Sequence, residues 1–381
     1  MNNQIIYFDN ASKTKPFKEV LDLYKEISET YFANPSSIHA LGSRNLRMLD
    51  KSKEELLRLL KLNTHQVIYV SSATEANNLA IKGYALKYKN RGNHIITSAY
   101  EHASVLETCK QLEEVFGFEV TYLYPNEDGI ITVDEISKNL KKETILVSIM
   151  EVNNEIGAIN PISDIAKLLK DYPKIALHVD AAQSLGKMKT LTNYQDVDLL
   201  TISSHKLHGL IGVGALIKKK NISLLPLLSG GGQEYGFRSG TNDLALSLCL
   251  TKAVSLSLLK QKENYDHVLQ ISKPLIEFLK NNGDLFEINI PKELNPYIIN
   301  FSTKTKKSSV VVEALSNQNI MVSSISACHS SKEKGSYVVK SLGKSEEVSR
   351  NTIRVSFSYE NTAEEVEIFI ETLKTIIGAI R

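Results

Sequence analysis

Short apolar runs recur along the first half of the chain, and most of them are followed directly by polar residues. Residues 175–179 and 197–202 are the clearest examples, because both runs are continuous rather than alternating. Runs of this kind are typical of strands that are buried on both faces of a parallel sheet. Amphipathic helical patterns occur between other runs, for example at 18–32 and 103–116. The alternation predicts an α/β fold with a mostly parallel sheet covered by helices.

The pattern changes after a leucine-rich helical stretch at 242–273, which we expect to end at Pro274. The residues that follow read as short strands and helices of a small α+β unit. At 381 residues, the chain is long enough for two domains. We therefore predict a large domain at 15–260 and a smaller domain formed by 1–14 and 261–381.

Two of the polar residues that follow strands suggest a cofactor site. Asp180 comes directly after the run at 175–179, and Lys206 comes shortly after the run at 197–202. Ligands of open α/β sheets bind beyond the carboxyl ends of the strands, so we expect both side chains at one site. A buried lysine can form a Schiff base, and an aspartate can pair with the ring nitrogen of pyridoxal phosphate (PLP). The alternative is a buried salt bridge between the two.

Two further strand ends carry candidate binding residues. Ala73 and Thr74 follow the strand expected at 66–70, and a helical pattern comes after them. A strand-to-helix turn of this kind can bind phosphate at the helix N-terminus, or it can serve only as an N-cap. His102 follows the strand expected at 94–97. A histidine there can stack on a cofactor ring and exchange protons, or it can be satisfied within the packing.

Two loops could also contribute to a pocket. The glycine-rich segment 229–241 ends in Thr241 and suits close backbone approach to an anion, although a flexible surface loop is the alternative. Asn34 and His39 lie in a loop between two expected helices. That loop could border a pocket or only connect the helices.

The chain contains three widely spaced cysteines, Cys109, Cys249 and Cys328. This spacing excludes a disulfide framework and a Cys-x-x-Cys metal site, and it is typical of a reducing compartment. Cys328 differs from the other two because it lies in a polar segment beside His329 and near lysines. Such surroundings favour the thiolate, so Cys328 is a candidate nucleophile.

Charge and hydropathy exclude several other classes of protein. The formal net charge is +2, which gives no electrostatic argument for binding nucleic acid or an anionic membrane. We find no apolar run long enough to span a membrane and no signal-peptide pattern at the start. We therefore expect a cytoplasmic protein without a metal site.

A series of short motifs also occurs along the chain. They are Asn34-Pro35-Ser36-Ser37 with His39 and Gly42; Ala73-Thr74-Glu75; Glu101-His102; Val152-Asn153-Asn154-Glu155-Ile156-Gly157; His178-Val179-Asp180-Ala181 with Gln183-Ser184; Ser203 with His205-Lys206; Gly230-Gly231-Gly232-Gln233-Glu234 with Arg238-Ser239-Gly240-Thr241; and Ser326-Ala327-Cys328. In this order they resemble the cysteine desulfurases, the NifS-like branch of the class V, fold-type I PLP enzymes. The resemblance covers essentially the whole chain. It implies a mostly parallel sheet of the seven-stranded type and a smaller α+β C-terminal domain.

The resemblance also implies a role for each motif. Lys206 would hold PLP covalently, Asp180 would pair with its ring nitrogen, and His102 would stack on the ring. The remaining implied contacts are Gln183 with the ring hydroxyl; Ala73, Thr74, Ser203 and His205 with the phosphate, joined by Thr241 from the second subunit of a homodimer; Asn154 with cofactor and substrate; and Asn34 and Arg354 with the substrate carboxylate. Cys328 would take sulfur from L-cysteine as a persulfide and leave L-alanine. The sulfur would then pass to an acceptor protein, either an iron–sulfur scaffold or a tRNA thiouridylase.

Several positions depart from the pattern usual in that family. Ser204 and Ile325 replace glycines, while Ser12 and Lys13 replace an alanine and a threonine near the expected pocket. None of these changes removes a group that the chemistry needs. Two other functions stay open at this point: another class V PLP enzyme, such as a selenocysteine lyase or an aminotransferase, which would not need Cys328, and a non-catalytic partner protein that keeps the fold.

Overall fold

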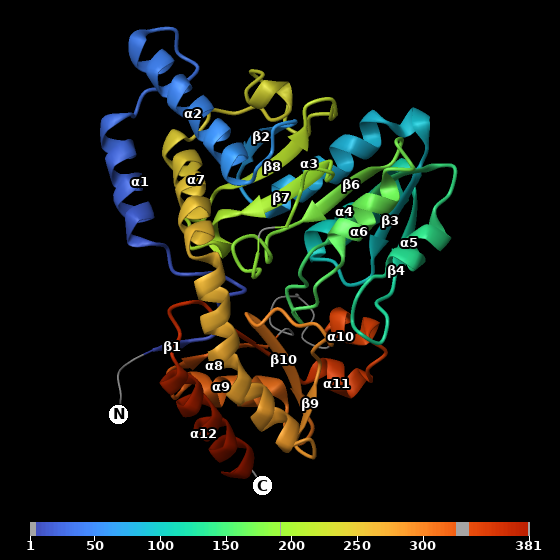
Figure 1. Ribbon diagram of the computed structural model, residues 1–381, viewed down its shortest axis with the longest axis vertical. Coiled ribbons are helices and arrows are strands. Elements are labelled where there is room, and N and C mark those ends of the chain that lie inside the picture. Colours follow the sequence, from blue (N-terminus) through green and yellow to red (C-terminus); the bar gives the residue numbers. More distant parts are fainter. Residues whose placement is uncertain (1–4, 191, 325–334, 380–381) are drawn as a thin grey trace.

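The computed structural model describes residues 5–190, 192–324 and 335–379. Its upper part in Figure 1 is a seven-stranded sheet with helices, and its lower part is a second, smaller sheet with its own helices. The order in the large sheet is β2-β8-β7-β6-β5-β3-β4. These strands are β2 (His65–Val70), β3 (His94–Ser98), β4 (Glu119–Leu123), β5 (Thr144–Met150), β6 (Ala176–Asp180), β7 (Leu199–Ser203) and β8 (Gly214–Lys219).

The predicted mostly parallel sheet is confirmed. Strands β5, β6 and β7 are buried along their whole length, as their continuous apolar runs predicted. Strand β8 runs antiparallel to both of its neighbours, β2 and β7, which the apolar pattern alone does not reveal.

Alternate residues of the large sheet enter two separate hydrophobic cores, one on each face. Ile68, Ile95 and Leu146 pack with residues of α3 and α4, whereas their neighbours Val67 and Val147 pack with residues of α2, α6 and α7. This follows from the two-residue period of side chains along a strand. The helices of this part are α1 (Lys18–Thr30), α2 (Ala40–Leu59), α3 (Ala73–Lys87), α4 (Ala103–Phe116), α5 (Val133–Asn139), α6 (Ile162–Leu169) and α7 (Leu244–Leu259), with short 3-10 turns η1 (Lys89–Arg91), η2 (Ser204–Lys206) and η3 (Glu234–Gly236).

The smaller sheet is antiparallel and has the order β12-β13-β10-β9. Its elements are α8 (Gln261–Asn281), β9 (Phe286–Ile288), β10 (Ile298–Thr303), α9 (Ser308–Ser316), β11 (Ile320–Met321), β12 (Ser323–Ser324), α10 (Tyr337–Ser341), α11 (Glu346–Arg350), β13 (Thr352–Ser356) and α12 (Ala363–Ala379). The N-terminal strand β1 (Ile6–Tyr7) pairs with β11. Phe8 then packs edge-on against Phe357 and Phe369, with ring centroids 5.2 and 5.7 Å apart. The start of the chain is therefore built into the core formed by its end.

The predicted single helix ending at Pro274 is wrong. The break falls at Lys260, whose backbone leaves the helical region, and α7 and α8 meet there at a bend of 66°. Pro274 lies inside α8, where the buried neighbours Ile271 and Leu275 pack into the small-sheet core and hold the helix across it. Among the described residues, no single helix is long and apolar enough to cross a membrane, and only the bent pair α7 and α8 meets that criterion jointly.

Candidate active site

A cavity of about 340 Å³ lies at the carboxyl ends of the central strands, where the two parts of the molecule meet. Most residues singled out from the sequence line it: Ala73, Thr74, His102, Asn154, Asp180, Gln183, Ser203, His205, Lys206 and Arg354. Its volume falls within the range that is usual for small-molecule sites. Residues far apart in the sequence therefore meet because their strands end at one edge of the sheet.

Lys206 follows β7 on the short turn η2, and its side chain reaches the N-terminal segment. The Nζ atom donates hydrogen bonds to the backbone oxygens of Ala11 and Ser12, both at 2.5 Å. These two carbonyls hold the amine at the wall of the cavity. The sequence prediction did not include this contact, because the partners lie almost two hundred positions earlier in the chain.

Asp180 ends β6, and hydrogen bonds hold its carboxylate in a fixed orientation. One oxygen accepts from Asn77 Nδ2 at 2.8 Å, and the other accepts from the backbone nitrogen of Ala182 at 2.9 Å. The residue is 5% exposed. A buried carboxylate held in this way keeps its direction without a mobile side chain, which suits a permanent partner for a positively charged ring nitrogen.

His102 caps the N-terminus of α4 and is oriented by Ser104. The backbone nitrogen of Ser104 donates to His102 Nδ1 at 3.1 Å, and Ser104 Oγ lies 2.8 Å from the same atom. Because a backbone N–H can only donate, Nδ1 is an acceptor and the proton of the neutral ring is on Nε2. Asn77 also donates to Ser104 Oγ at 2.8 Å, so one amide group links the supports of His102 and Asp180.

The part of the cavity wall formed by Ala73, Thr74, Ser203 and His205 is suited to an anion. Helix α3 begins at Ala73, so Ala73 and Thr74 form its first turn, where backbone N–H groups and the helix dipole favour negative charge. Ser203 Oγ lies 3.2 Å from His205 Nδ1. Burial, together with the positive charges of Lys206, Lys187 and Lys13, lowers the pKa of His205 to about 4. His205 is therefore neutral at pH 7 and can take part in hydrogen bonds without adding charge.

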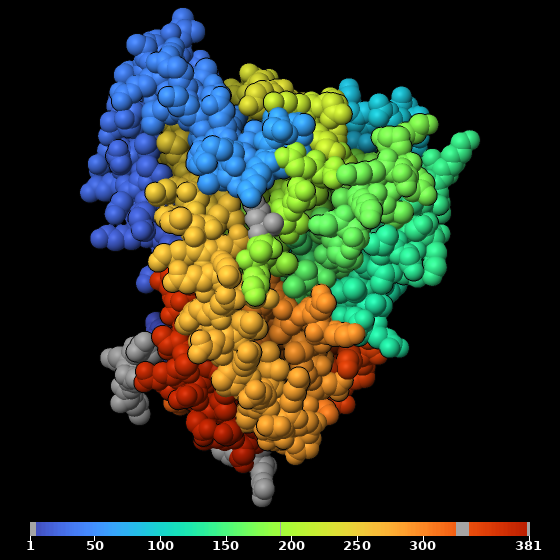
Figure 2. All heavy atoms as spheres, in the orientation of Figure 1, coloured from blue at the N-terminus to red at the C-terminus, as the bar shows by residue number. Residues whose placement is uncertain are grey.

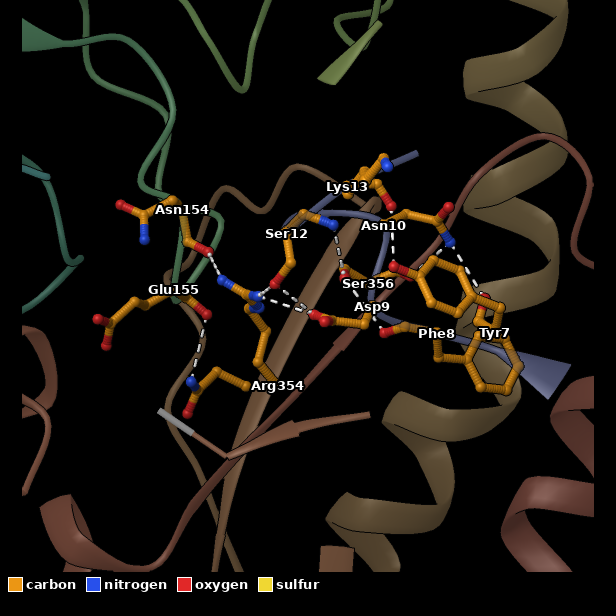
Figure 3. A network of polar contacts seen from close by, with 12 residues as sticks. Tyr7, Phe8, Asp9, Asn10, Ser12, Lys13, Asn154, Glu155, Arg354 and Ser356 are labelled. Carbon is orange, nitrogen blue, oxygen red and sulfur yellow. Dashed lines mark hydrogen bonds and ion pairs between the residues drawn. The ribbon is translucent and has the colours of Figure 1, made fainter. Parts of the chain in front are cut away.

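Arg354 enters from β13 of the smaller sheet, as Figure 3 shows. Its Nη1 donates to the backbone oxygen of Asn154 at 2.9 Å, and its Nη2 donates to Asp9 Oδ1 at 2.9 Å and to Ser12 Oγ at 2.7 Å. Ser12 in turn donates to Asp9 Oδ1 at 2.7 Å. Arg354 Nε is buried and has no hydrogen-bond partner among the residues that the structure describes. The guanidinium is thus fixed in place at the cavity, where its positive charge could pair with a bound carboxylate.

Two site residues had no assigned role in the sequence reasoning: Asp9 was missed, and Ser12 was noted only as a departure from the family pattern near the expected pocket. They follow the first strand, so the rule that polar residues after strands line the pocket could have found them. Glu155 and Tyr337 were missed as well, and both line the cavity. Tyr337 donates its hydroxyl to the backbone oxygen of Glu101 at 2.7 Å, which joins α10 to the end of β3.

Three predicted residues are not part of the cavity as the structure describes it. Asn34 is exposed before α2, where its Oδ1 accepts from the backbone nitrogen of Ser36 at 2.9 Å. Thr241 is exposed before α7. Cys328 lies outside the described residues, so the structure does not test its prediction. His39, the other candidate of the Asn34 loop, caps α2 by accepting from the backbone nitrogen of Gly42 at 3.2 Å.

The family model described as "Aminotransferase class-V" matches residues 6–369, nearly the whole chain. A protein described as "NifS/IcsS protein homolog" from Lactobacillus delbrueckii is 38% identical over 98% of this chain and 97% of its own length. "Cysteine desulfurase IscS" of Dictyoglomus turgidum is 36% identical over 99% of this chain and 95% of its own length.

The solved structures agree with these relatives. A structure described as "NIFS-LIKE PROTEIN" superposes with a TM-score of 0.91 at 30% identity, covering 99% of this chain and 100% of that one. A second, described as "SspA in complex with cysteine", has a TM-score of 0.80 at 33% identity and covers 94% of this chain and 100% of that one.

The family match and the similar fold show that the chain belongs to the class V aminotransferases. Within that class, the chain belongs to the cysteine desulfurases of the NifS and IscS type. The resemblance drawn from the motifs is thereby confirmed, and the relatives support cysteine desulfurase activity. Enzymes of this family depend in general on PLP, act on L-cysteine and pass its sulfur to acceptors.

Proposed function

We propose that the cavity binds PLP and L-cysteine, and that the chain passes the sulfur of L-cysteine through Cys328 to an acceptor protein in the cytoplasm. One observation carries the proposal: Lys206, Asp180 and Arg354 come from three different elements and line a single cavity. The neighbour described with bound cysteine supports the choice of substrate. The acceptor would be an iron–sulfur scaffold or a tRNA-thiolating protein.

The residues present fit PLP. The first turn of α3 offers a phosphate site. Gly214 on β8 allows the backbone at the start of α3 to lie close to the strand, since a Cβ atom there would be 2.9 Å from Ser72 C and 3.1 Å from Ala73 N. Asp180 presents a fixed carboxylate for a ring nitrogen, and Lys206 presents an amine. The proposed contacts are those that the family pattern implies: Ala73, Thr74, Ser203 and His205 for the phosphate, Gln183 for the ring hydroxyl, His102 on the ring face, and Asn154 at the substrate side.

The chain's own groups would divide the work around the cofactor. When bound, PLP withdraws electrons from the substrate carbon that carries the amine. Asp180 favours this by keeping a proton on the ring nitrogen. The Lys206 amine, which the carbonyls of Ala11 and Ser12 hold at the cavity wall, would remove the proton from that carbon. Arg354 and Asn154, which both line the cavity, would hold the substrate carboxylate, and Asn34 would join them only if a second subunit supplied it.

The sulfur transfer would use Cys328 as the nucleophile. Its thiolate attacks the sulfur of the bound L-cysteine, so that an S–S bond forms while the bond between substrate carbon and sulfur breaks. The electron pair of the broken bond stays on the carbon that carried the sulfur, and this carbon takes up a proton to become a methyl group. Lys206 would return a proton to the carbon that carries the amine, so that the product is L-alanine. Cys328 then carries the extra sulfur as a persulfide.

The direct test is to purify the protein, add PLP and record its visible spectrum before supplying L-cysteine with a thiol reductant. We expect an absorbance band from lysine-bound PLP, and L-alanine and sulfide in equal amounts. A protein that PLP cannot turn yellow would contradict the cofactor proposal and favour the non-catalytic alternative.

Replacing Gly214 by alanine should weaken PLP binding. The added Cβ would press against the first turn of α3, and the displaced N–H groups would lose hydrogen bonds to the phosphate. Because hydrogen bonds to charged groups contribute about 1.5–3 kcal/mol, we expect a loss of affinity of about tenfold or more. Titration of the apoprotein with PLP measures this. Gly283→Ala is the control, since its nearest neighbour would lie 3.8 Å from the new Cβ; equal affinities for the two variants would argue against a phosphate at α3.

We further propose a homodimer in which Thr241 of one subunit completes the phosphate site of the other. Thr241 and Asn34 lie outside the cavity of the single chain, although the family pattern assigns both to it. Helices α1 and α2, coloured blue in Figure 2, stand at one edge of the molecule. Exposed apolar side chains of these helices and of the segment between them offer a surface for a second copy. They are Leu21, Phe32, Ile38, Leu41 and Leu46, which are 48%, 78%, 100%, 52% and 45% exposed.

Co-expressing Lys206→Ala and Thr241→Ala chains tests the shared site. In a mixed dimer, the site that keeps Lys206 would receive an intact Thr241 from the other subunit. We expect that site to bind PLP as tightly as the wild type, whereas the Thr241→Ala homodimer binds about tenfold more weakly. A mixed dimer with the weaker affinity of the Thr241→Ala homodimer, or a fully active monomer at micromolar concentration, would exclude the shared site.

A further inference from the structure

Lys187 is a buried lysine that the proposed chemistry does not use. It ends the turn that follows Asp180, the last residue of β6; Gln183 lies in the same turn, and Lys187 is 6% exposed. Its Nζ donates to Gln183 Oε1 at 3.0 Å. Asn295 Nδ2 donates to the backbone oxygen of Lys187 at 3.2 Å, which anchors the end of the turn to the smaller part of the molecule.

We propose that Lys187 is a positioning residue that fixes the side-chain amide of Gln183 with its NH₂ group toward the cofactor. The inference rests on the proposed function, because it takes the cavity to be the PLP site. Because the Lys187 amine donates to the side chain of Gln183, the amide oxygen of Gln183 must face Lys187. The amide nitrogen then faces the other way, and Nε2 indeed donates to the backbone oxygen of Ala11 at 2.8 Å.

This orientation matters for what Gln183 can offer to the ring. An amide nitrogen has two hydrogens, and one of them is directed at Ala11. The other can be donated to the ring oxygen of PLP, which carries negative charge. If the amide were turned over, its own oxygen would face that oxygen and repel it. Lys187 excludes this arrangement, since its amine would then meet an NH₂ group.

The same contact couples Lys187 to Lys206. Ala11 O accepts from both Gln183 Nε2 and Lys206 Nζ, so a continuous set of hydrogen bonds runs from Lys187 to the amine that would hold PLP. The charged and titratable groups facing Lys187 are Lys206, Arg354, His205 and His208. Burial and then the charges of Lys206 and Arg354 lower the pKa of Lys187 to about 7. Below this pKa the ammonium can only donate, which requires the amide oxygen of Gln183 on its side. Above it the neutral amine can still donate, and Ala11 O, which accepts from Nε2, supports the same orientation.

The test is the pH dependence of the visible band in the PLP-loaded protein. A hydrogen bond donated to the ring oxygen stabilises its negative charge most when the neighbouring lysine linkage has lost its proton. Losing that hydrogen bond should therefore raise the pH at which the linkage between PLP and lysine loses its proton, measured as the midpoint of the change in the visible band. We expect Lys187→Met to raise it by about 0.5–1 pH unit, and Gln183→Leu to raise it by a similar amount. Lys187→Arg should stay closer to the wild type because it keeps the donor.

Two comparisons make the outcome decisive. Adding Lys187→Met to Gln183→Leu should shift the midpoint by less than about 0.3 unit more, because residues that act through one another are not additive. Lys189→Met is the matched control, since Lys189 is 58% exposed and pairs with Asp266 outside the cavity. Thermal unfolding of each apoprotein shows whether a variant is folded, and if Lys187→Met is not, Lys187→Leu, which also lacks a donor, replaces it. Shifts that add fully in the double variant, or a midpoint that Lys187→Met leaves unchanged, would overturn the role of Lys187. The proposed function would still stand in that case if the wild type binds PLP on a lysine and is yellow. A wild type that binds no PLP would overturn both proposals.

Discussion

Lys206→Ala should lose essentially all conversion of L-cysteine to L-alanine while the protein stays folded. The amine is the group that would hold PLP covalently and later remove the substrate proton, so one substitution removes both functions. Loss of a general base alone costs about 10²–10⁴-fold in rate, and we expect a fall of at least about 10³-fold. Folding should persist because the substitution removes only the two hydrogen bonds that Nζ donates to backbone oxygens at the cavity wall.

Borohydride trapping identifies the lysine directly. Reduction of the PLP-loaded wild type, followed by digestion and mass spectrometry, should place the cofactor on the peptide that contains Lys206. PLP should still bind Lys206→Ala through its phosphate, without the covalent link. Lys187 and Lys13 are the internal comparisons, because their charges act on His205 in the same site. Reduced cofactor on either of them would show that the assignment of Lys206 is wrong.

Cys328→Ser should separate substrate binding from sulfur transfer. PLP binding and the spectral change on adding L-cysteine should be kept, because they depend on Lys206, Asp180 and Arg354. Production of L-alanine and of transferable sulfur should fall to background, since a serine hydroxyl is a poor nucleophile toward sulfur at neutral pH.

The described cysteines offer no substitute for Cys328. Cys109 and Cys249 are both buried, and burial raises the pKa of Cys249 to about 12 and raises that of Cys109 as well. Neither would form a thiolate at neutral pH. Cys249→Ser is therefore the matched control and should retain activity, with its hydroxyl donating to the backbone oxygen of Val20 as the thiol does. Mass spectrometry should find one added sulfur on the Cys328 peptide; sulfur on another cysteine, or full turnover by Cys328→Ser, would instead favour the lyase or aminotransferase alternative.

The parts of the site that could be predicted are those in which a polar residue stands at the carboxyl end of a strand. Asp180, His102 and Lys206 each follow a strand of the parallel sheet, so their convergence follows from the topology alone. Arg354 was assigned by resemblance, and its contacts with Asp9 and Ser12 were missed. The contact between Asp9 and Arg354 spans 345 positions and joins strands outside the large sheet, so no local pattern marks it.

Two features of the fold were hidden for similar physical reasons. The direction of β8 depends on its pairing with β2 and β7, whereas the apolar run shows only that the strand is buried. The break at Lys260 lies between two good helical patterns, and Pro274 is a stronger local signal for a helix end. Packing of α8 against the smaller sheet overrides that signal.

The position of the first residues has a consequence for biosynthesis. Residues 5–12 are synthesised long before their partners, since Phe8 packs on Phe357 and Phe369, and Asp9 pairs with Arg354. The carbonyls of Ala11 and Ser12 that position Lys206 are set by this same segment. The part of the cavity wall that holds Lys206 can therefore form in full only after the chain up to Phe369 has been synthesised. A nascent chain that has completed only its large sheet would still lack this part of the site.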